Sequence, residues 1–326
     1  MNDRQATHTP RALVLGATGG IGGELARQLR DGGWTVVALT RGLEAACIER
    51  DGMVWVRGDA MDREAVVNAA RGCNVIVHAV NPPGYLRWSE LVLPMIDNTI
   101  AAAAAAGATV VLPGTIYNYG EQAFPLLRED SPQQPSTRKG KIRVELERRL
   151  QDATQQGVRT IVVRAGDFFG PRIGHSWFSQ GLVKAGRLAS VVRLPGRRGV
   201  GHLWSYVPDV ARTMMALIER RATLAPFATF HMAGHWDEDG TQMAEAIRRV
   251  MARQGVRASL KRFPWWLVRL TSPFVPTLRE LMEMHYLWQV RVQMSNAQLQ
   301  TVLGEEPHTP LDSAVEATLV GIGCLR

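Results

Sequence analysis

The first half of the chain alternates short apolar runs with longer segments whose apolar residues recur every three or four positions. Residues 12–15 form such a run, and Ile21, Leu25 and Leu29 after it have helical spacing. The alternation continues to residue 164 and predicts a series of buried strands connected by helices. The expected strands cover residues 12–15, 35–39, 53–56, 75–79, 108–112 and 158–164, and further helices are expected over residues 62–70, 88–106 and 139–156.

Strands that are apolar throughout and alternate with helices are typical of a parallel sheet covered on both faces. The expected fold class is therefore α/β, with a doubly wound Rossmann-type parallel sheet and a smaller C-terminal substrate or cap domain. The pattern loosens after Gly166, although a helix over 208–221 and a strand over 227–231 are expected to return to the sheet. The expected cofactor-binding domain comprises residues 1–165 and 205–234, and the expected cap comprises 166–204 and 235–326.

A glycine-rich turn, Gly16-Ala17-Thr18-Gly19-Gly20-Ile21-Gly22, lies directly between the first expected strand and the first expected helix. Glycine permits a tight turn there and lets backbone N–H groups approach a pyrophosphate. The anion would then lie at the positive N-terminus of the helix. In this strand–turn–helix setting the motif predicts a dinucleotide-binding site.

The G-x-x-G-x-x-G spacing resembles the extended and atypical short-chain dehydrogenase/reductases, the NAD-dependent epimerase/dehydratase-like family. The resemblance implies a nicotinamide cofactor, with Asp59 near the adenine and residues 164–171 near the nicotinamide. It runs through most of the chain. The motifs that carry it are Gly58-Asp59, Val77-His78-Ala79, Asn98, the segment 164–171 (RAGDFFGP), the segment 206–211 (YVPDVA), Leu303-Gly304 and Pro310-Leu311.

The end of the second strand predicts which dinucleotide is bound. NAD-specific sites place a carboxylate there to accept hydrogen bonds from the ribose 2′-hydroxyl, but this chain has Leu39-Thr40-Arg41. Arg41 could pair with a 2′-phosphate, so NADP(H) is the preferred cofactor and NAD the alternative. The residues expected to contact the cofactor are Gly16, Thr18, Gly19, Gly20, Ile21, Gly22, Thr40, Arg41, Asp59, Ala60, Ala79, Val80, Lys141, Ala165, Asp167 and Phe168.

The resemblance also implies a catalytic set, from which this chain departs. The family pairs a Ser or Thr with a Tyr-x-x-x-Lys, whose Lys holds the ribose and lowers the pKa of the Tyr. Thr115 matches the Ser/Thr, and Lys141 matches the Lys, with Glu145 four residues later. Thr137 then stands where Tyr belongs, and a threonine hydroxyl is far less acidic than a phenol, whose pKa is about 10.

Three interpretations of this departure remain open. Tyr117 could supply the phenol, or Lys141 could carry the proton as well as orient the ribose. Alternatively, the protein binds NADP(H) without turnover, like the redox-sensing NmrA-like regulators. We expect an NADP(H)-dependent oxidoreductase that exchanges hydride with a carbonyl or an equivalent polarised carbon of a small organic substrate; a sugar-nucleotide epimerase or dehydratase is a further alternative, which the missing Tyr disfavours.

The region after residue 166 is expected to supply substrate contacts or cap core. Its aromatic and basic residues follow the turn that crosses the open end of the sheet. The Trp- and Arg-rich segment 262–270 suits either an apolar lid or a membrane interface. The candidate substrate contacts are Phe168, Phe169, Arg172, His175, Trp177, Phe178, His202 and Trp204.

Composition narrows the class of protein. The chain of 326 residues is 46% hydrophobic and 21% charged, which is typical of a globular protein. Its net charge is +8, and one run of cations comprises Arg248, Arg249, Arg253, Arg257, Lys261 and Arg262. No nucleic-acid-binding motif accompanies this run, so a solvated surface and no nucleic-acid partner are expected. Partners are expected to be a small-molecule substrate, with a homodimer left open.

Compartment is predicted from the cysteines and the apolar segments. Cys47, Cys73 and Cys324 lie far apart, and the histidines lack metal-ligand spacing, so neither a disulfide framework nor a metal site is expected. The polar N-terminus does not resemble a signal peptide. The apolar stretch 91–113 is too interrupted for a membrane span. A cytoplasmic protein without integral membrane contact is expected.

Overall fold

A computed structural model describes residues 9–82, 87–174 and 176–325. Its largest element is an eight-stranded sheet with the strand order β12-β8-β6-β5-β1-β2-β4-β3. The neighbouring strands pair in parallel, except β3, which pairs antiparallel with β4 at one edge. The strands are β1 (Arg11–Leu15), β2 (Thr35–Thr40), β3 (Cys47–Arg50), β4 (Met53–Arg57), β5 (Val75–His78), β6 (Thr109–Gly114), β8 (Arg159–Arg164) and β12 (Phe227–His231).

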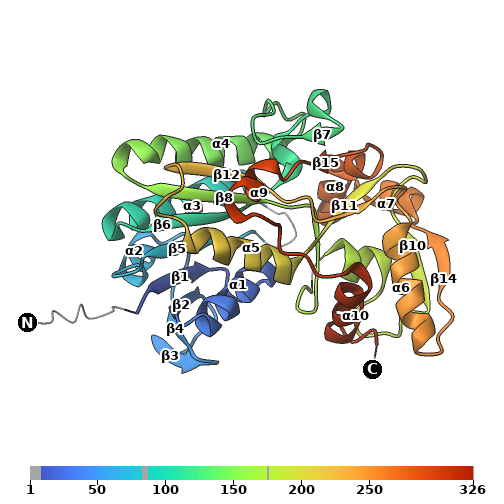
Figure 1. Ribbon diagram of the computed structural model, residues 1–326, viewed down its shortest axis with the longest axis horizontal. Coiled ribbons are helices and arrows are strands. Elements are labelled where there is room, and N and C mark those ends of the chain that lie inside the picture. Colours follow the sequence, from blue (N-terminus) through green and yellow to red (C-terminus); the bar gives the residue numbers. More distant parts are fainter. Residues whose placement is uncertain (1–8, 83–86, 175, 326) are drawn as a thin grey trace, which may run out of the picture.

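Helices cover both faces of this sheet (Figure 1). On one face Leu25 and Met214 share a core with the sheet, and on the other face Ile96 and Leu146 do so. The doubly wound α/β prediction is therefore confirmed. The first face carries α1 (Gly20–Asp31) and α5 (Val207–Glu219), and the second carries α2 (Arg63–Ala69), α3 (Trp88–Ala106) and α4 (Arg138–Asp152).

The predicted bounds agree with the structure to within two residues at most ends, because buried apolar runs and helical spacing are strong local signals. The helix expected over 139–156 ends as α4 at Asp152 and continues as a 3₁₀ turn. Strand β3 was not predicted, since it is a largely exposed edge strand without an apolar run. Helix α9 (Ala297–Leu303), expected in the cap, instead packs its buried Leu299 into the core of the large sheet.

The order of the strands creates the place for a ligand. The chain runs from β1 outward through β2 to β4 in one direction and from β5 through β6 and β8 to β12 in the other. Such a reversal leaves a crevice at the carboxyl ends of the two central strands, here β1 and β5. The glycine-rich turn follows β1, and Ala79 follows β5, so both border this crevice.

The remaining elements form a smaller cap on one side of the crevice (Figure 1). Its core includes Phe169, Phe178, Ile247 and Leu319. The cap sheets are β9 (Asp167–Phe169), β11 (His202–Tyr206) with β13 (His235–Asp237), and β10 (Val191–Leu194) with β14 (Ser259–Arg262), while β7 (Leu126–Leu127) pairs with β15 (Gln293–Met294). The cap helices are α6 (Gln242–Arg253), α7 (Trp265–Thr271), α8 (Pro276–Glu283) and α10 (Leu311–Gly321), with shorter helical turns over Trp177–Leu182 and His285–Trp288. Further helical turns cover Ile116–Asn118 and Glu121–Ala123 after β6, and Ala153–Gln156 at the end of α4, where Ala153 belongs to the core of the large sheet.

Two further features bear on the sequence predictions. All three cysteines are free, and Cys47 is exposed whereas Cys73 and Cys324 are buried. Within the described parts of the chain, no helix combines the length and the apolar character that crossing a membrane requires.

A buried ion pair joins α4 to the end of β8. Arg164 is fully buried, and its Nη1 donates to Glu147 Oε1 at 2.7 Å and to the carbonyl oxygen of Thr115 at 3.0 Å. Its Nη2 also bonds the other oxygen of Glu147. Three segments far apart in the sequence therefore meet at one guanidinium.

We predict that Glu147→Gln destabilises the fold by about 3–5 kcal/mol, because it removes the negative charge that compensates a buried cation. Glu145→Gln on the same helix is the matched control. Glu145 is partly exposed and pairs with Arg148 and Arg149, so its loss should cost less than about 1 kcal/mol. Urea denaturation followed by circular dichroism measures both. Equal effects would show that Glu147 has no special structural role.

Candidate functional site

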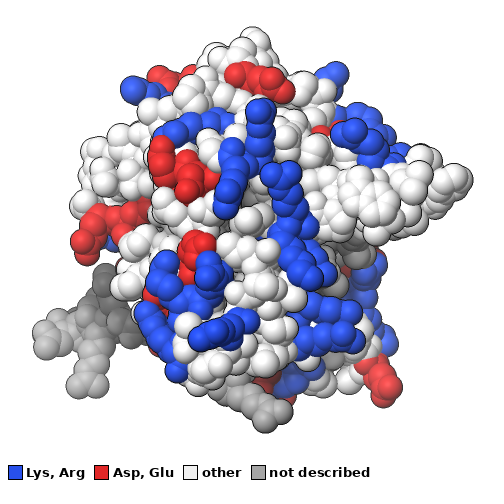
Figure 2. Space-filling model, turned by 90° about the vertical axis from the view of Figure 1, so that its right-hand side faces the viewer, with Lys and Arg blue, Asp and Glu red and all other residues white. Residues whose placement is uncertain are grey.

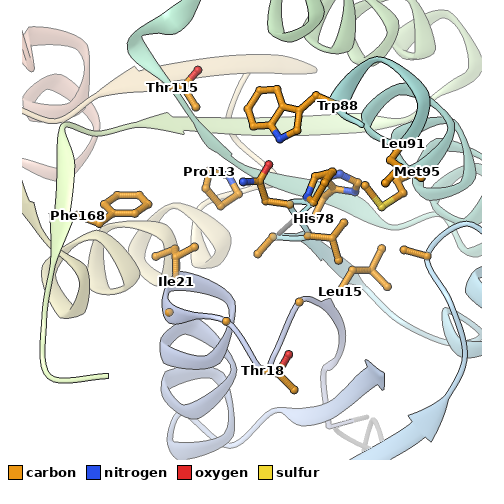
Figure 3. Close-up of a pocket in the computed structure, with 18 of the residues that line it drawn as sticks. Leu15, Thr18, Ile21, His78, Trp88, Leu91, Met95, Pro113, Thr115 and Phe168 are labelled. Carbon is orange, nitrogen blue, oxygen red and sulfur yellow. The ribbon is translucent and has the colours of Figure 1, made fainter. Parts of the chain in front are cut away.

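A cavity of about 520 Å³ occupies the crevice between the sheet and the cap. Thr18 and Ile21 come from the glycine-rich turn at one side of it, and Thr115 lies near its far end (Figure 3). Phe168 faces Leu91 and Met95 across the cavity. The pocket therefore combines a backbone-lined part at the turn with an apolar part between α3 and the cap.

The glycine-rich turn is built for close backbone contact. Gly16 has a φ of +92°, and a Cβ at this position would lie 2.5 Å from the carbonyl oxygen of Ala79. A Cβ on Gly22 would lie 2.4 Å from the carbonyl oxygen of Gly16. Gly22 thus packs against the backbone of Gly16 within the turn, whereas Gly19 and Gly20 line the pocket at the start of α1. The first N–H groups of this helix have no intrahelical acceptor, so the cradle fits a pyrophosphate.

The structure brings the residues expected at the adenosine end to the same pocket. Thr40, Arg41, Asp59 and Ala60 line it, as do Ala79 and Val80. Arg41 Nη1 lies 3.9 Å from Asp59 Oδ2, and both side chains are exposed. The loop that carries Asp59 is held by Asn98, whose Nδ2 donates to the carbonyl oxygen of Ala60 at 2.9 Å.

The opposite end of the pocket is formed by the ends of β6 and β8. Ala165, Asp167 and Phe168 line it, together with Thr115 and Tyr117. The hydroxyl of Thr115 donates to Asn118 Oδ1 at 3.2 Å. Thr115 and Tyr117 therefore border the pocket at the end away from Arg41.

Lys141 and Thr137, in contrast, lie outside the pocket lining. Thr137 caps the N-terminus of α4, where its Oγ1 accepts a hydrogen bond from Gly140 N at 3.0 Å. Lys141 is exposed, and the residue of α4 that reaches the pocket is Arg143. The expectation that Lys141 holds the ribose is thus not supported by its position, because the turn of the helix directs a residue two places later toward the cavity.

This geometry favours a Tyr-x-x-x-Lys register two residues later than the sequence suggested. Lys139 and Arg143 then occupy the two positions, and Glu147 follows four residues after Arg143. Glu147 binds the buried Arg164, whereas Glu145 is partly exposed and pairs with neighbouring arginines. A basic residue is followed four places later by Glu both at Lys141 and at Arg143, so the sequence alone did not separate the two registers. The burial of Glu147 favours the later one.

Lys139 is enclosed by acidic side chains from α8. Its side chain is only 2% exposed, and its Nζ forms ion pairs with Glu280 and, at 2.5 Å, with Glu283. Glu283 Oε1 also accepts a hydrogen bond from the backbone N–H of Arg138 at 2.7 Å. In the later register, the Tyr position would therefore hold an ammonium group neutralised by the cap.

His78 lines the pocket without being a suitable acid. Its Nδ1 lies 2.8 Å from Thr99 Oγ1 in a buried hydrogen bond. Burial, with a smaller effect of Arg143, lowers the pKa of His78 to about 3, so the ring is neutral near pH 7. His78 is therefore a packed, hydrogen-bonded histidine.

Some of the expected substrate contacts from the cap line the pocket, and others do not. Phe168 and Trp177 line the pocket, but Phe169, Phe178 and Trp204 lie in the core of the cap. Arg172 forms an ion pair with Glu24 at 3.3 Å. His202 Nε2 lies 2.8 Å from Asp167 Oδ2. His175 lies outside the described residues. Helix α3 adds Trp88, Leu91 and Met95, which the sequence analysis did not single out, because apolar residues on a helix have the same spacing whether they face a core or a pocket.

One group of potential metal ligands lies elsewhere. Asp209, His235 and His308 each bring one ligand atom within 4.8 Å of the others. The carboxylate of Asp209 already accepts hydrogen bonds from the N–H of Thr309 at 2.7 Å and its hydroxyl at 2.8 Å, and it pairs with Arg212. We assign no metal to this group, and the absence of a metal stays a prediction.

Known proteins resemble this chain in sequence and in fold. A family model described as NAD dependent epimerase/dehydratase family matches residues 12–233. A Streptomyces protein named 3-diazoavenalumate denitrifying reductase is 32% identical over an alignment of 232 residues. The match covers 65% of this chain and 73% of that protein.

Two solved structures share the fold along nearly the whole chain. MoeE5 in complex with UDP-glucose and NAD matches with a TM-score of 0.72 and 20% identity, over 95% of this chain and 98% of that one. L-threonine dehydrogenase from Clostridium difficile matches with a TM-score of 0.74 and 16% identity, over 97% of this chain and 98% of that one. At these identities the likeness shows the fold.

We predict that Arg143→Met weakens NADPH binding at least tenfold, because the pocket wall loses a charged hydrogen-bond donor. Hydrogen bonds to charged groups are worth about 1.5–3 kcal/mol. Lys141→Met, two residues away on the exposed side, should change the dissociation constant less than about twofold by the same reasoning. Isothermal titration calorimetry measures both. A large loss in Lys141→Met with none in Arg143→Met would restore the original register.

Proposed function

Because the chain belongs to the NAD-dependent epimerase/dehydratase family, we propose that it is an NADP(H)-dependent reductase that delivers hydride to an electrophilic carbon of a small organic substrate. The observation that carries the proposal is which basic residue of α4 lines the pocket and which is enclosed by acidic residues. Arg143 lines the cavity as a cation, while Lys139 is held in ion pairs with Glu280 and Glu283. The site therefore keeps the parts that bind a dinucleotide and lacks the usual acid at position 139.

Each part of the pocket has a task in this proposal. The N–H groups at the start of α1 bind the pyrophosphate, and Arg41 faces the 2′-phosphate that distinguishes NADP(H) from NAD. Arg143 would hold the nicotinamide ribose, while Phe168 and Trp177 would exclude water from the pocket. When bound, NADPH supplies the hydride. Thr115 and Asp167 are left to position a substrate, and Asp167 is itself held by His202 at 2.8 Å.

The missing phenol restricts the substrate. Hydride transfer to a carbonyl produces an alkoxide, which needs a proton from a nearby acid. Among the described residues that line the pocket, Tyr117 is the tyrosine available for this. A carbon that bears a departing nitrogen group needs no proton: hydride forms the new C–H bond, the C–N bond breaks, and N₂ leaves with the bonding electron pair.

We therefore favour a diazo-type electrophile, in its cationic diazonium form, as the substrate class. The name of the 32% identical Streptomyces protein, a denitrifying reductase of 3-diazoavenalumate, supports this choice. The apolar wall of Trp88, Leu91, Met95 and Phe168 suits an aromatic ring. Sugar-nucleotide epimerisation is disfavoured, because removing a sugar hydroxyl proton requires a base that the enclosed Lys139 does not supply.

Cofactor choice is the first test. Wild-type protein should bind NADPH at least several-fold tighter than NADH, and Arg41→Asp should reverse that order, because a carboxylate repels the 2′-phosphate and accepts hydrogen bonds from a 2′-hydroxyl. Arg63→Asp makes the same charge change on α2, away from the pocket lining, and should leave the preference intact. Equal affinity of the wild type for both dinucleotides would contradict the role of Arg41.

Substrate class is the second test. With NADPH and an arenediazonium salt, the enzyme should oxidise NADPH and release N₂ well above the rate of an Arg143→Met control, and Tyr117→Phe should retain most of this activity. The loss of absorbance at the NADPH band follows cofactor oxidation, and gas measurement follows the release of N₂. Preferred turnover of ketones or aldehydes, reduced about 10²-fold or more in Tyr117→Phe, would instead identify Tyr117 as a general acid. Tight NADPH binding without turnover of either class would favour a regulatory protein.

A further inference from the structure

The exposed apolar side chains of the cap are concentrated in one short segment. Trp266 is 70% exposed, Leu270 64% and Phe274 84%, and Leu267 and Val275 beside them are exposed as well. These five residues lie on α7 and the turn that leads to α8. We call residues 261–279 the α7–α8 tip. Exposed apolar clusters of this kind mark surfaces that contact another phase or partner.

The same part of the chain carries an excess of positive charge. Residues 246–279 contain eight Lys or Arg and no Asp or Glu. Arg248, Arg249 and Arg253 pair with Glu245 or Asp312 elsewhere on the cap. The other cations are exposed and form no ion pair within the described residues; they are Arg257, Lys261, Arg262, Arg269 and Arg279. Figure 2 shows Lys and Arg side chains gathered over this end of the molecule, beside an uncharged protrusion.

The acidic residues of α8 are turned away from this surface. Glu280 and Glu283 are mostly buried because both bind Lys139 on α4. The negative charges of α8 are therefore used inside the protein, and the tip presents apolar and cationic groups together. An apolar surface edged with unpaired cations is complementary to a layer that is apolar inside and anionic outside.

We propose that the α7–α8 tip docks peripherally on an anionic lipid bilayer. Trp266, Leu270 and Phe274 would enter the boundary between headgroups and acyl chains, and the four cations within the tip would contact lipid phosphates. These cations are Lys261, Arg262, Arg269 and Arg279. A second copy of the chain fits less well, because a twofold contact through the tip would bring the like charges of both copies together. The inference is independent of the proposed reductase activity.

The tip is also connected to the pocket. Trp177, which lines the cavity, has its ring centroid 5.6 Å from that of Phe263 and 5.5 Å from that of Trp265. Phe263 and Trp265 stand at the base of α7. A docked tip would thus place the cap side of the cavity next to the membrane, where apolar substrates concentrate.

Vesicle co-sedimentation of the full chain tests the proposal. Wild-type protein should sediment with vesicles of phosphatidylcholine mixed with phosphatidylglycerol and bind pure phosphatidylcholine at least tenfold more weakly. The double variants Trp266→Ser/Phe274→Ser and Lys261→Glu/Arg262→Glu should each reduce binding to the mixed vesicles at least tenfold. Val320→Ser, which removes a 51% exposed apolar residue on α10, and Arg248→Glu are the matched controls and should bind as the wild type does.

Three outcomes would overturn the proposal. The wild type does not sediment with anionic vesicles; the tip variants bind as well as the controls; or the chain is a dimer that the tip variants dissociate, which would identify a second copy as the occupant. The NADPH affinity of every variant is measured as well. An affinity equal to that of the wild type shows that the variant is folded. A loss of vesicle binding is then a property of the tip and not of the cofactor site.

Discussion

The buried ion pair of Glu147 and Arg164 organises the end of the pocket where the substrate would lie. Arg164 ends β8, immediately before the wall formed by residues 165–168, and it also donates to the carbonyl oxygen of Thr115. Glu147 places α4 on this point, and Arg143, one turn earlier, is thereby brought to the cavity. A buried guanidinium tolerates only an arrangement that satisfies its charge, so these segments are held in one relative position.

Helix α8 links the site to the outer surface of the cap. Its two glutamates reach inward to Lys139, while the segment before it exposes Trp266 and Phe274. In the register that we propose for α4, these inward contacts hold the residue that replaces the family's Tyr. This arrangement favours chemistry in which hydride transfer alone completes the reaction, and it leaves the outer face of the tip with apolar and positive groups.

Most of the large sheet and its helices could be predicted from the sequence, because strands buried on both faces and amphipathic helices leave strong local patterns. The edge strand β3 has no such pattern, since it is largely exposed to solvent. The short strands of the cap also escaped prediction; pairs such as β10 with β14 join residues far apart in the chain, and only tertiary contact creates them.

The sequence by itself determined the glycine-rich turn, the missing carboxylate after β2 and the positions of Thr115 and Tyr117, because each follows directly from a strand end. It did not determine which residue of α4 faces the cavity. Lys141 and Arg143 are each followed by Glu four residues later. A helix turns by roughly 100° per residue, so a shift of two residues moves a side chain to another face. Only the packing of α4 against Arg164 and α8 decided that Arg143 lines the pocket, that Lys139 is enclosed and that Lys141 is exposed.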